Sequence, residues 1–258
     1  NNTNLKYTHT ITFTLNNRTT NADFTITGPN NFSDTVSCTA SGTTCSYTDY
    51  LVPNTLGNYT VRVGNSDLVK TFSVQDVYAC GDTITMNWTL IGNVDCSDTT
   101  GNVFTLGANN IVVDLNGFSI IANASSQTFY SISRTNNTIK NGQIISNNTA
   151  SGHYAITTES SDKSVYQNLT IQNYNRGIYL FRDSDHNIIN QSNFTNQVNS
   201  IYIQGSVQIP NNINMTYNTF KEGISIFSTS GNNLIIENNN FTLSHGIDIE
   251  SGSNLVIK

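Results

Sequence analysis

Apolar and polar residues alternate along most of this chain, which is the pattern of β-strands. Over the first 75 residues, six such stretches bounded by turn residues are predicted as strands: Leu5–Leu15, Ala22–Thr27, Asp34–Ala40, Thr44–Tyr50, Gly57–Val63 and Leu68–Val74. Six short strands in this length predict a small antiparallel β-sandwich over residues 1–75. Leu5–Leu15 is the most regular of them. It is either the first strand of its own domain or a strand that completes the sheet of a neighbour.

From about residue 76 the alternation becomes a repeat. Apolar pairs recur every 23 residues, with steps of 24 and 26 near the start: Phe104/Leu106, Tyr130/Ile132, Tyr154/Ile156, Ile178/Leu180, Ile201/Ile203, Ile224/Ile226 and Ile247/Ile249. A second apolar strand, often preceded by Asn or Asp, lies between successive pairs. The repeat predicts coils of two or three strands, stacked in parallel about 4.8 Å apart with equivalent residues above one another. A propeller blade takes about 40 residues, so this period is too short for a propeller.

The repeat assigns a direction to each side chain. One ladder of buried residues is predicted to consist of Ile178, Ile201, Ile224 and Ile247. An outward aromatic patch is predicted from Tyr179, Phe181, Tyr202 and Phe227, with Ser131, Ser133, Ala155 and Thr157 at the equivalent sites of earlier coils. Exposed aromatic clusters are rarely left bare, so we expect this patch to contact the N-terminal domain, another subunit or a sugar.

Turn residues carry two further expectations. Asn218 and Asn239 precede Phe220 and Phe241 at equivalent positions and are expected to hydrogen-bond along the stack. Glycines precede three of the strands and are expected to have positive φ, namely Gly177, Gly223 and Gly246.

Two segments resemble known families. Gly57–Val63 is similar to the immunoglobulin-like strand that begins with Gly-x-Tyr. The array, with frames such as Gly246-Ile247-Asp248-Ile249 and Asn238–Thr242, resembles the right-handed parallel β-helix repeats of archaeal and bacterial surface proteins, including the NosD-like family. Cys80–Cys96, followed by Val113–Ile120, looks like the start of that array in archaeal cell-surface proteins.

The resemblance implies an all-β fold. The expected domains are an immunoglobulin-like β-sandwich over residues 1–75 and a right-handed parallel β-helix over residues 76–258. The coils are expected to continue past Lys258 or to be capped by assembly, because the last residues read as a strand. The same helix carries enzymes, adhesins and structural modules, so the fold alone does not name a function.

Four cysteines fall in two local pairs, Cys38/Cys45 and Cys80/Cys96. An even count at short spacing predicts two disulfides and an oxidising compartment. If Ser41 and Gly42 form a two-residue turn, Cys38 and Cys45 lie opposite each other within disulfide range. A zinc site is the alternative, but the paired spacings that zinc sites use are absent.

Composition places the protein outside the cell. Only 11% of the residues are charged, the net charge is −6, and no run of Lys or Arg occurs, which argues against nucleic-acid or anionic-membrane partners. No apolar run of about 18 residues predicts a transmembrane segment. The chain begins with Asn1, which indicates a processed, extracellular or cell-surface protein.

Uncharged polar residues, many of them in Asn-x-Ser/Thr sequons, must supply the solubility. The acceptor asparagines are Asn1, Asn17, Asn31, Asn58, Asn87, Asn123, Asn136, Asn147, Asn168, Asn190, Asn193, Asn214 and Asn240. We expect covalent N-glycans on the outward-facing ones and no other cofactor.

Catalytic and metal-binding patterns are weak. Asp248 and Glu250 are predicted to face outward, but no acidic stack forms above them. Asp183, Asp185 and Asn187 have a spacing similar to that of a calcium loop without its glycine and distal glutamate, so a solvated turn is expected. The four histidines, His9, His153, His186 and His245, are scattered, and no metal site is expected.

These observations favour a non-enzymatic, self-assembling structural subunit of an extracellular filament, appendage or surface layer. The alternative is a carbohydrate-binding or adhesion module, whose exposed aromatic rings stack on sugars. A polysaccharide lyase or glycosidase is the third reading, because many β-helix enzymes act on glycans and use clustered carboxylates.

Overall fold

The computed structural model divides the chain into two compact units, Asn1–Val77 and Tyr78–Lys258. It describes residues 3–5, 10–51, 57–64, 68–74, 78–123, 127–147, 153–205, 209–242, 246–252 and 254–258. Asn1, Tyr7, His9 and His245, which carried expectations above, lie outside these ranges. Apart from one short 3-10 turn, η1 (Pro29–Asn31), the described elements are all strands, so the protein is all-β as predicted.

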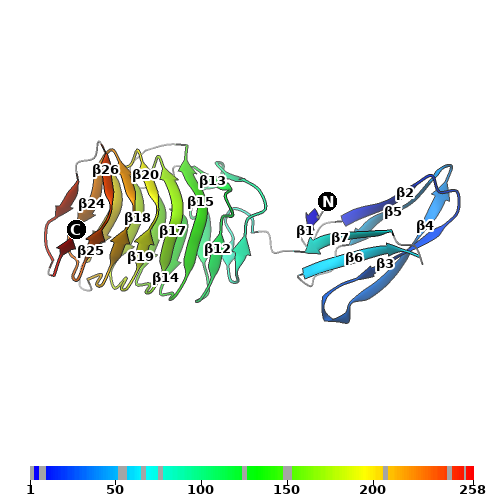
Figure 1. Cartoon of the computed structure of the whole chain (residues 1–258), viewed down its shortest axis with the longest axis horizontal. Helices are drawn as coiled ribbons and strands as arrows, with labels where there is room; N and C mark the ends of the chain where they lie inside the picture. Colours follow the sequence, from blue (N-terminus) through cyan, green and yellow to red (C-terminus); the bar gives the residue numbers. More distant parts are fainter. Residues whose placement is uncertain are drawn as a thin grey trace. The chain divides into compact units, whose positions relative to one another are not determined.

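The first unit is a seven-stranded, mostly antiparallel sheet with the order β1-β7-β6-β3-β4-β5-β2 (Figure 1). Its strands are β1 (Thr3–Leu5), β2 (Thr10–Asn16), β3 (Ala22–Thr27), β4 (Ser33–Ser41), β5 (Thr44–Leu51), β6 (Gly57–Val63) and β7 (Val69–Val74). Its core is aromatic: the rings of Tyr59 and Phe72 stack 5.1 Å apart, and Phe24 and Ile26 are buried beside them.

The predicted strand Leu5–Leu15 is two strands in the structure. β1 pairs in parallel with β7, and β2 pairs antiparallel with β5 at the other end of the strand order. A break in register between Ile11 and Phe13 marks a bulge in β2. Both pieces therefore pair inside their own domain.

Both predicted disulfides form, between Cys38 and Cys45 and between Cys80 and Cys96. The geometry expected for the first pair is wrong in detail. Cys45 lies opposite Ala40, because the turn between β4 and β5 is Gly42-Thr43 and not Ser41-Gly42. Cys38 is therefore the diagonal neighbour of Cys45, with the two Cα atoms 5.5 Å apart.

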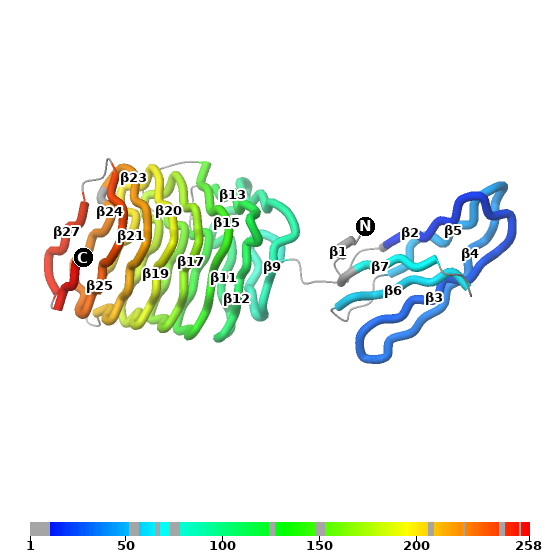
Figure 2. Tube along the Cα trace, viewed as in Figure 1, coloured from blue at the N-terminus to red at the C-terminus, as the bar shows by residue number. Residues whose placement is uncertain are grey.

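The second unit is a parallel β-solenoid, as predicted (Figure 2). One wall is an eight-stranded parallel sheet. In chain order its strands are β8 (Thr83–Ile84), β11 (Phe104–Leu106), β14 (Gln127–Ile132), β16 (Tyr154–Glu159), β18 (Arg176–Phe181), β21 (Asn199–Gln204), β24 (Ile224–Ser228) and β27 (Ile247–Ile249).

The other wall is a 13-stranded sheet in which β15 (Thr138–Ser146) and β17 (Val165–Gln172) each pair with two shorter strands of a neighbouring coil. The shorter strands are β9 (Trp88–Thr89), β10 (Val94–Cys96), β12 (Val112–Asp114), β13 (Ser119–Ala122), β19 (Ile188–Asn190), β20 (Asn193–Thr195), β22 (Asn214–Thr216), β23 (Thr219–Lys221), β25 (Ile235–Glu237), β26 (Asn240–Thr242) and β28 (Val256–Ile257).

The predicted register is correct between β18 and β21 and wrong on either side. Ile178 lies beside Ile201 as expected. Ile201 then pairs with Ile226, and Ile226 pairs with Ile247, so the predicted pairing of Ile224 with Ile247 is incorrect. The spacing between paired residues is thus 25 and then 21 residues, not a constant 23. Toward the start, Ile156 takes the position expected for Tyr154.

Buried asparagines close the turns between coils, as predicted for Asn218 and Asn239. The Asn239 side-chain oxygen accepts hydrogen bonds from the Asn218 backbone N–H at 2.8 Å and from its side-chain amide at 3.1 Å. Asn187 repeats the arrangement: its amide donates to the Ser161 and Ser184 carbonyls, and its oxygen accepts from the Ser164 N–H. Backbone groups that leave the ladder at these corners are therefore satisfied by side chains.

The glycine expectation holds at two positions. Gly223 and Gly246 have φ values of 67° and 84°. Gly177 is not in this positive-φ region. A Cβ atom there would lie 2.4 Å from the Ser200 carbonyl oxygen, so close approach of the next coil requires this glycine.

Candidate functional site

The outer face of the eight-stranded sheet carries a cluster of aromatic side chains over β14 to β24. Its members, which we call the aromatic face, are Tyr130, Tyr154, Tyr179, Phe181, Tyr202 and Phe227. They face outward because they alternate with the buried residues of the same strands, such as Ile178 and Leu180.

The predicted patch belongs to this face but is only part of it. The sites aligned with Tyr179 on the two earlier coils are Thr157 and Tyr130, and Glu159 aligns with Phe181. Ser131 and Ala155 do not occupy these positions. The face therefore begins at β14, two coils earlier than the sequence register indicated.

The rings form one continuous row along the stacking direction. The ring centroid of Tyr179 lies 5.2 Å from those of Tyr154 and Tyr202, and that of Tyr202 lies 5.2 Å from that of Phe227. Phe181 stacks 5.4 Å from Tyr179 on the same strand. Tyr179 and Tyr202 are 9% and 8% exposed, so the row presents a flat, partly exposed surface made by mutual packing.

Arg176 lies within this row. Its guanidinium carbon is 3.7 Å from the ring centroid of Tyr202, 4.9 Å from that of Tyr179 and 5.1 Å from that of Tyr154. Its Nη1 donates a hydrogen bond to the Tyr154 hydroxyl at 3.1 Å. Each cation–π contact of this kind contributes about 0.5–2 kcal/mol, so one arginine links the rings of three coils.

A polar network borders the rings. Glu159 accepts a hydrogen bond from the Tyr130 hydroxyl at 2.8 Å and forms an ion pair with Arg182 at 2.6 Å. The Tyr179 hydroxyl donates to Gln204 at 2.5 Å. Burial, assisted by the hydrogen bond to Glu159, raises the pKa of Tyr130 to about 12. Burial also raises the pKa of Tyr179 to about 12, so both hydroxyls remain proton donors at neutral pH.

Sequence reasoning missed Tyr130, Tyr154, Glu159 and Arg176 as members of this site. Arg176 and Tyr154 share one register position, which places them on the same outward row. The signal was present in the alternation along β16 and β18, but only the correct register shows that these residues are neighbours.

The turn after β18 gathers several carboxylates without forming a metal site of the expected loop type. The Asp185 side chain accepts hydrogen bonds from the backbone and side chain of Asn211 at 2.7 and 3.3 Å, and Asp162 accepts from the Asp185 N–H. Burial raises the pKa of Asp185, with Asp183 and Asp162 adding to the shift. Within the described ranges, no group of three or more His, Cys, Asp or Glu could hold a metal ion.

Asp248 is distant from the other carboxylates of the sheet. It aligns with Phe227 on β24, and not with Ser225 as the sequence register implied. Glu159 lies four strands away along the same sheet, about 19 Å at 4.8 Å per strand.

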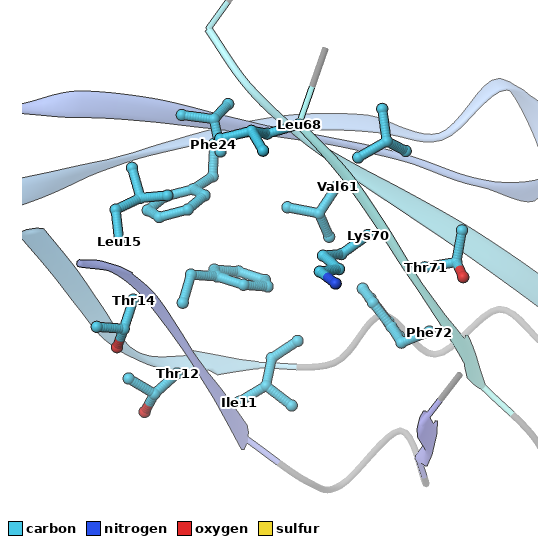
Figure 3. Close-up of a pocket in the computed structure, with 13 residues that line it drawn as sticks. Ile11, Thr12, Thr14, Leu15, Phe24, Val61, Leu68, Lys70, Thr71 and Phe72 are labelled. Atoms are coloured by element: carbon cyan, nitrogen blue, oxygen red, sulfur yellow. The ribbon is translucent and has the colours of Figure 1, made fainter. Parts of the chain in front are cut away.

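The first unit contains an apolar groove of 440 Å³ between β2 and β7, shown in Figure 3. Side chains of Ile11, Leu15, Phe24, Val61 and Phe72 line it. Lys70 is the one charged side chain in the lining, so the groove is suited to apolar packing and not to acid–base chemistry.

The sequons differ in exposure. Exposed acceptors within the described ranges are Asn17, Asn31, Asn58, Asn87, Asn136, Asn147, Asn168, Asn193 and Asn240. Asn123, Asn190 and Asn214 are half-buried, and Asn1 lies outside these ranges. No helix in the described part of the chain is long and apolar enough to cross a membrane. The two disulfides are consistent with a secreted protein.

No family model and no curated protein matches this chain. Solved structures do. One is named "Catalytic domain of GH87 alpha-1,3-glucanase in complex with nigerose", with 13% identity, a TM-score of 0.29, and coverage of 97% of this chain and 68% of that chain. A D1068A variant of the same domain with tetrasaccharides has 12% identity, the same TM-score and the same coverage. "Crystal structure of Agl-KA catalytic domain" has 10% identity and a TM-score of 0.19, covering 98% and 91%.

These matches correct the expectation of a non-enzymatic structural subunit. The matched structures are named as catalytic domains, five of them of an α-1,3-glucanase, which points to the third reading, a glycosidase. Identities of 10–14% assign no role to any residue of this chain.

Proposed function

We propose that this protein acts on a polysaccharide, which the β-solenoid binds along the aromatic face. The observation that supports this most directly is the row of Tyr154, Tyr179, Tyr202 and Phe227, with the Arg176 guanidinium against three of the rings. Rings and hydrogen-bonding groups together suit a ligand with both apolar C–H faces and hydroxyls, which is the chemistry of a sugar.

The dimensions of the face suit an extended chain. The row runs from β14 to β24, five strands of one sheet, and so spans about 19 Å along the stacking direction at 4.8 Å per strand. Glu159, Arg182 and Gln204 border it with donors and acceptors for hydroxyl groups. A flat row of this length accommodates several consecutive sugar units.

Hydrolysis is the second candidate activity, and Glu159 favours it. This carboxylate is 16% exposed at the edge of the aromatic face and is held by Arg182 and Tyr130. Glycoside hydrolysis ordinarily uses two carboxyl groups about 5–10 Å apart. Strands β14 to β24 contain Glu159 as their only carboxylate, so the second group would come from the turn after β18, where Asp183 and Asp185 lie.

The finer assignments belong to the same proposal. We propose a secreted or cell-surface glycoprotein with an immunoglobulin-like first domain and a right-handed, NosD-like β-helix. Disulfides and exposed sequons support the location. Association between copies stays a prediction, which light scattering of the purified chain tests.

The experiment is affinity electrophoresis of the full chain through gels that contain neutral or acidic polysaccharides, combined with a reducing-sugar assay on the same polysaccharides. The variant Tyr202→Ala removes the ring closest to Arg176 and is expected to weaken binding at least tenfold. Tyr217→Ala is the matched control, because Tyr217 is 63% exposed and lies outside the face. Glu159→Gln is expected to abolish any sugar release. Absence of retention on every polysaccharide contradicts the proposal.

A further inference from the structure

We infer that the polysaccharide is acidic and that Arg176 binds the carboxylate of a uronic acid unit. This inference rests on the proposed function and deepens it. It starts from the charges of the aromatic face, which do not balance.

Two of the three charged groups at the face neutralise each other. Arg182 and Glu159 form an ion pair at 2.6 Å. Among the residues that the structure describes, no carboxylate forms an ion pair with Arg176. One positive charge therefore remains in the centre of the row, on a chain whose net charge is −6.

The hydrogen-bonding capacity of Arg176 is also unfilled. A guanidinium has five N–H donors. The Tyr154 hydroxyl accepts one of them, and the Nε atom is buried without a partner. Burying a donor without an acceptor costs about 1–3 kcal/mol, so a ligand that supplies acceptors here gains what the free protein lacks.

The surroundings strengthen an ionic contact at this place. Tyr154, Tyr179 and Tyr202 pack around the guanidinium and exclude water from its flanks. Charge interactions are stronger where water is excluded. The planar fork of an arginine matches the two oxygens of a carboxylate, which favours a uronate over a sulfate ester.

A structural role for Arg176 is the competing explanation, since its contacts link three coils. The two roles differ in what a conservative variant does. Arg176→Lys keeps the charge and loses the fork, whereas Arg176→Gln loses both. A structural role predicts a lower unfolding midpoint and equal losses of affinity for neutral and acidic glycans.

The test compares polygalacturonate with its fully methyl-esterified form, which has the same sugar chain without the charge. Dextran sulfate and neutral dextran extend the series. Affinities of the full chain are measured by isothermal titration calorimetry at 50 mM and 500 mM NaCl. The wild-type protein is expected to bind polygalacturonate at least tenfold more tightly than the ester, and this preference is expected to shrink at high salt.

Arg176→Gln is expected to remove the preference and leave the affinity for the ester within twofold, with Arg176→Lys intermediate. Lys140→Gln is the matched control, because it removes one positive charge on the other wall of the solenoid and should change neither affinity. Equal wild-type affinity for the acid and the ester overturns the inference while the aromatic face stands. Preference for dextran sulfate over polygalacturonate overturns the assignment of a carboxylate. Failure to bind any of the four polymers contradicts the proposed function itself.

Discussion

Ile226 pairs with Ile247 on the next coil and with Ile201 on the coil before, and its side chain is fully buried. Replacement of Ile226 by alanine removes buried methyl groups and leaves a cavity, which typically costs about 2–5 kcal/mol of unfolding free energy. Ile235→Ala is the matched control, since Ile235 is 36% exposed, and it should cost less than about 1 kcal/mol. Urea denaturation of both variants measures the difference. Equal midpoints would place Ile226 outside the core.

The sequence predicts the solenoid well but its register poorly, for a physical reason. Strand alternation has a period of two, so a slip of two residues keeps every side chain on its own face. Ile224 and Ile226 are both isoleucine, and the alternation fits either as the partner of Ile247. Loops of unequal length decide between them, and a constant period of 23 overlooks those loops.

The same slip limited the candidate site. Tyr179, Phe181 and Tyr202 could be assigned to the outer face because that assignment needs only the alternation. The contact of Arg176 with Tyr202 joins two coils and depends on the register between them. Cross-coil chemistry is therefore the part of the site that this sequence conceals.

The corner asparagines are expected to be as important for stability as the apolar core. Asn187→Leu removes hydrogen bonds to two carbonyls and one N–H, all at buried positions. Each buried group left unpaired costs about 1–3 kcal/mol, so we expect a loss of at least 3 kcal/mol. Asn193→Leu, at an exposed position of β20, should stay within about 0.5 kcal/mol. Thermal unfolding that does not distinguish the two variants would show that water replaces the amide.

The two disulfides should contribute unequally. Cys80–Cys96 spans 16 residues and Cys38–Cys45 spans 7. In the chain-entropy model these loops correspond to about 3 and about 2 kcal/mol. Double serine variants of each pair, compared by guanidinium denaturation, should therefore differ by about 1 kcal/mol. A larger loss for Cys38/Cys45 would mean that loop entropy is not the main source of stabilisation.

Exposure should decide which sequons carry glycans. Asn17, Asn31 and Asn193 are exposed, whereas Asn190 and Asn214 are half-buried with their side-chain oxygens enclosed and unpartnered. Peptide mass spectrometry of protein from its native source should therefore find sugar on the first group and none on the second. Occupancy of Asn190 or Asn214 would require those corners to open before or during folding.

Acidification should destabilise the solenoid through His153, a histidine that is 5% exposed at the start of the aromatic-face strand β16. Burial lowers its pKa, and its Nδ1 atom has no hydrogen-bond partner. The unfolded chain takes up a proton on this histidine near pH 6.5, before the folded chain does. The contribution to stability is therefore fully present above pH 6.5 and is lost as the pH falls through the lower folded pKa.

His153→Asn removes this proton linkage. Between pH 7.5 and pH 5, the unfolding midpoint of the variant should fall less than that of the wild type. His186→Asn serves as the control, because His186 is exposed in the turn after β18 and has only Asn212 as a side-chain partner among the described residues. Its removal should leave the pH dependence of the wild type unchanged. Asp185, whose raised pKa favours the folded state at low pH, acts in the opposite direction and is present in all three proteins, so the comparison isolates His153. Identical pH dependence in the wild type and His153→Asn would show that His153 takes up its proton without opening the coil.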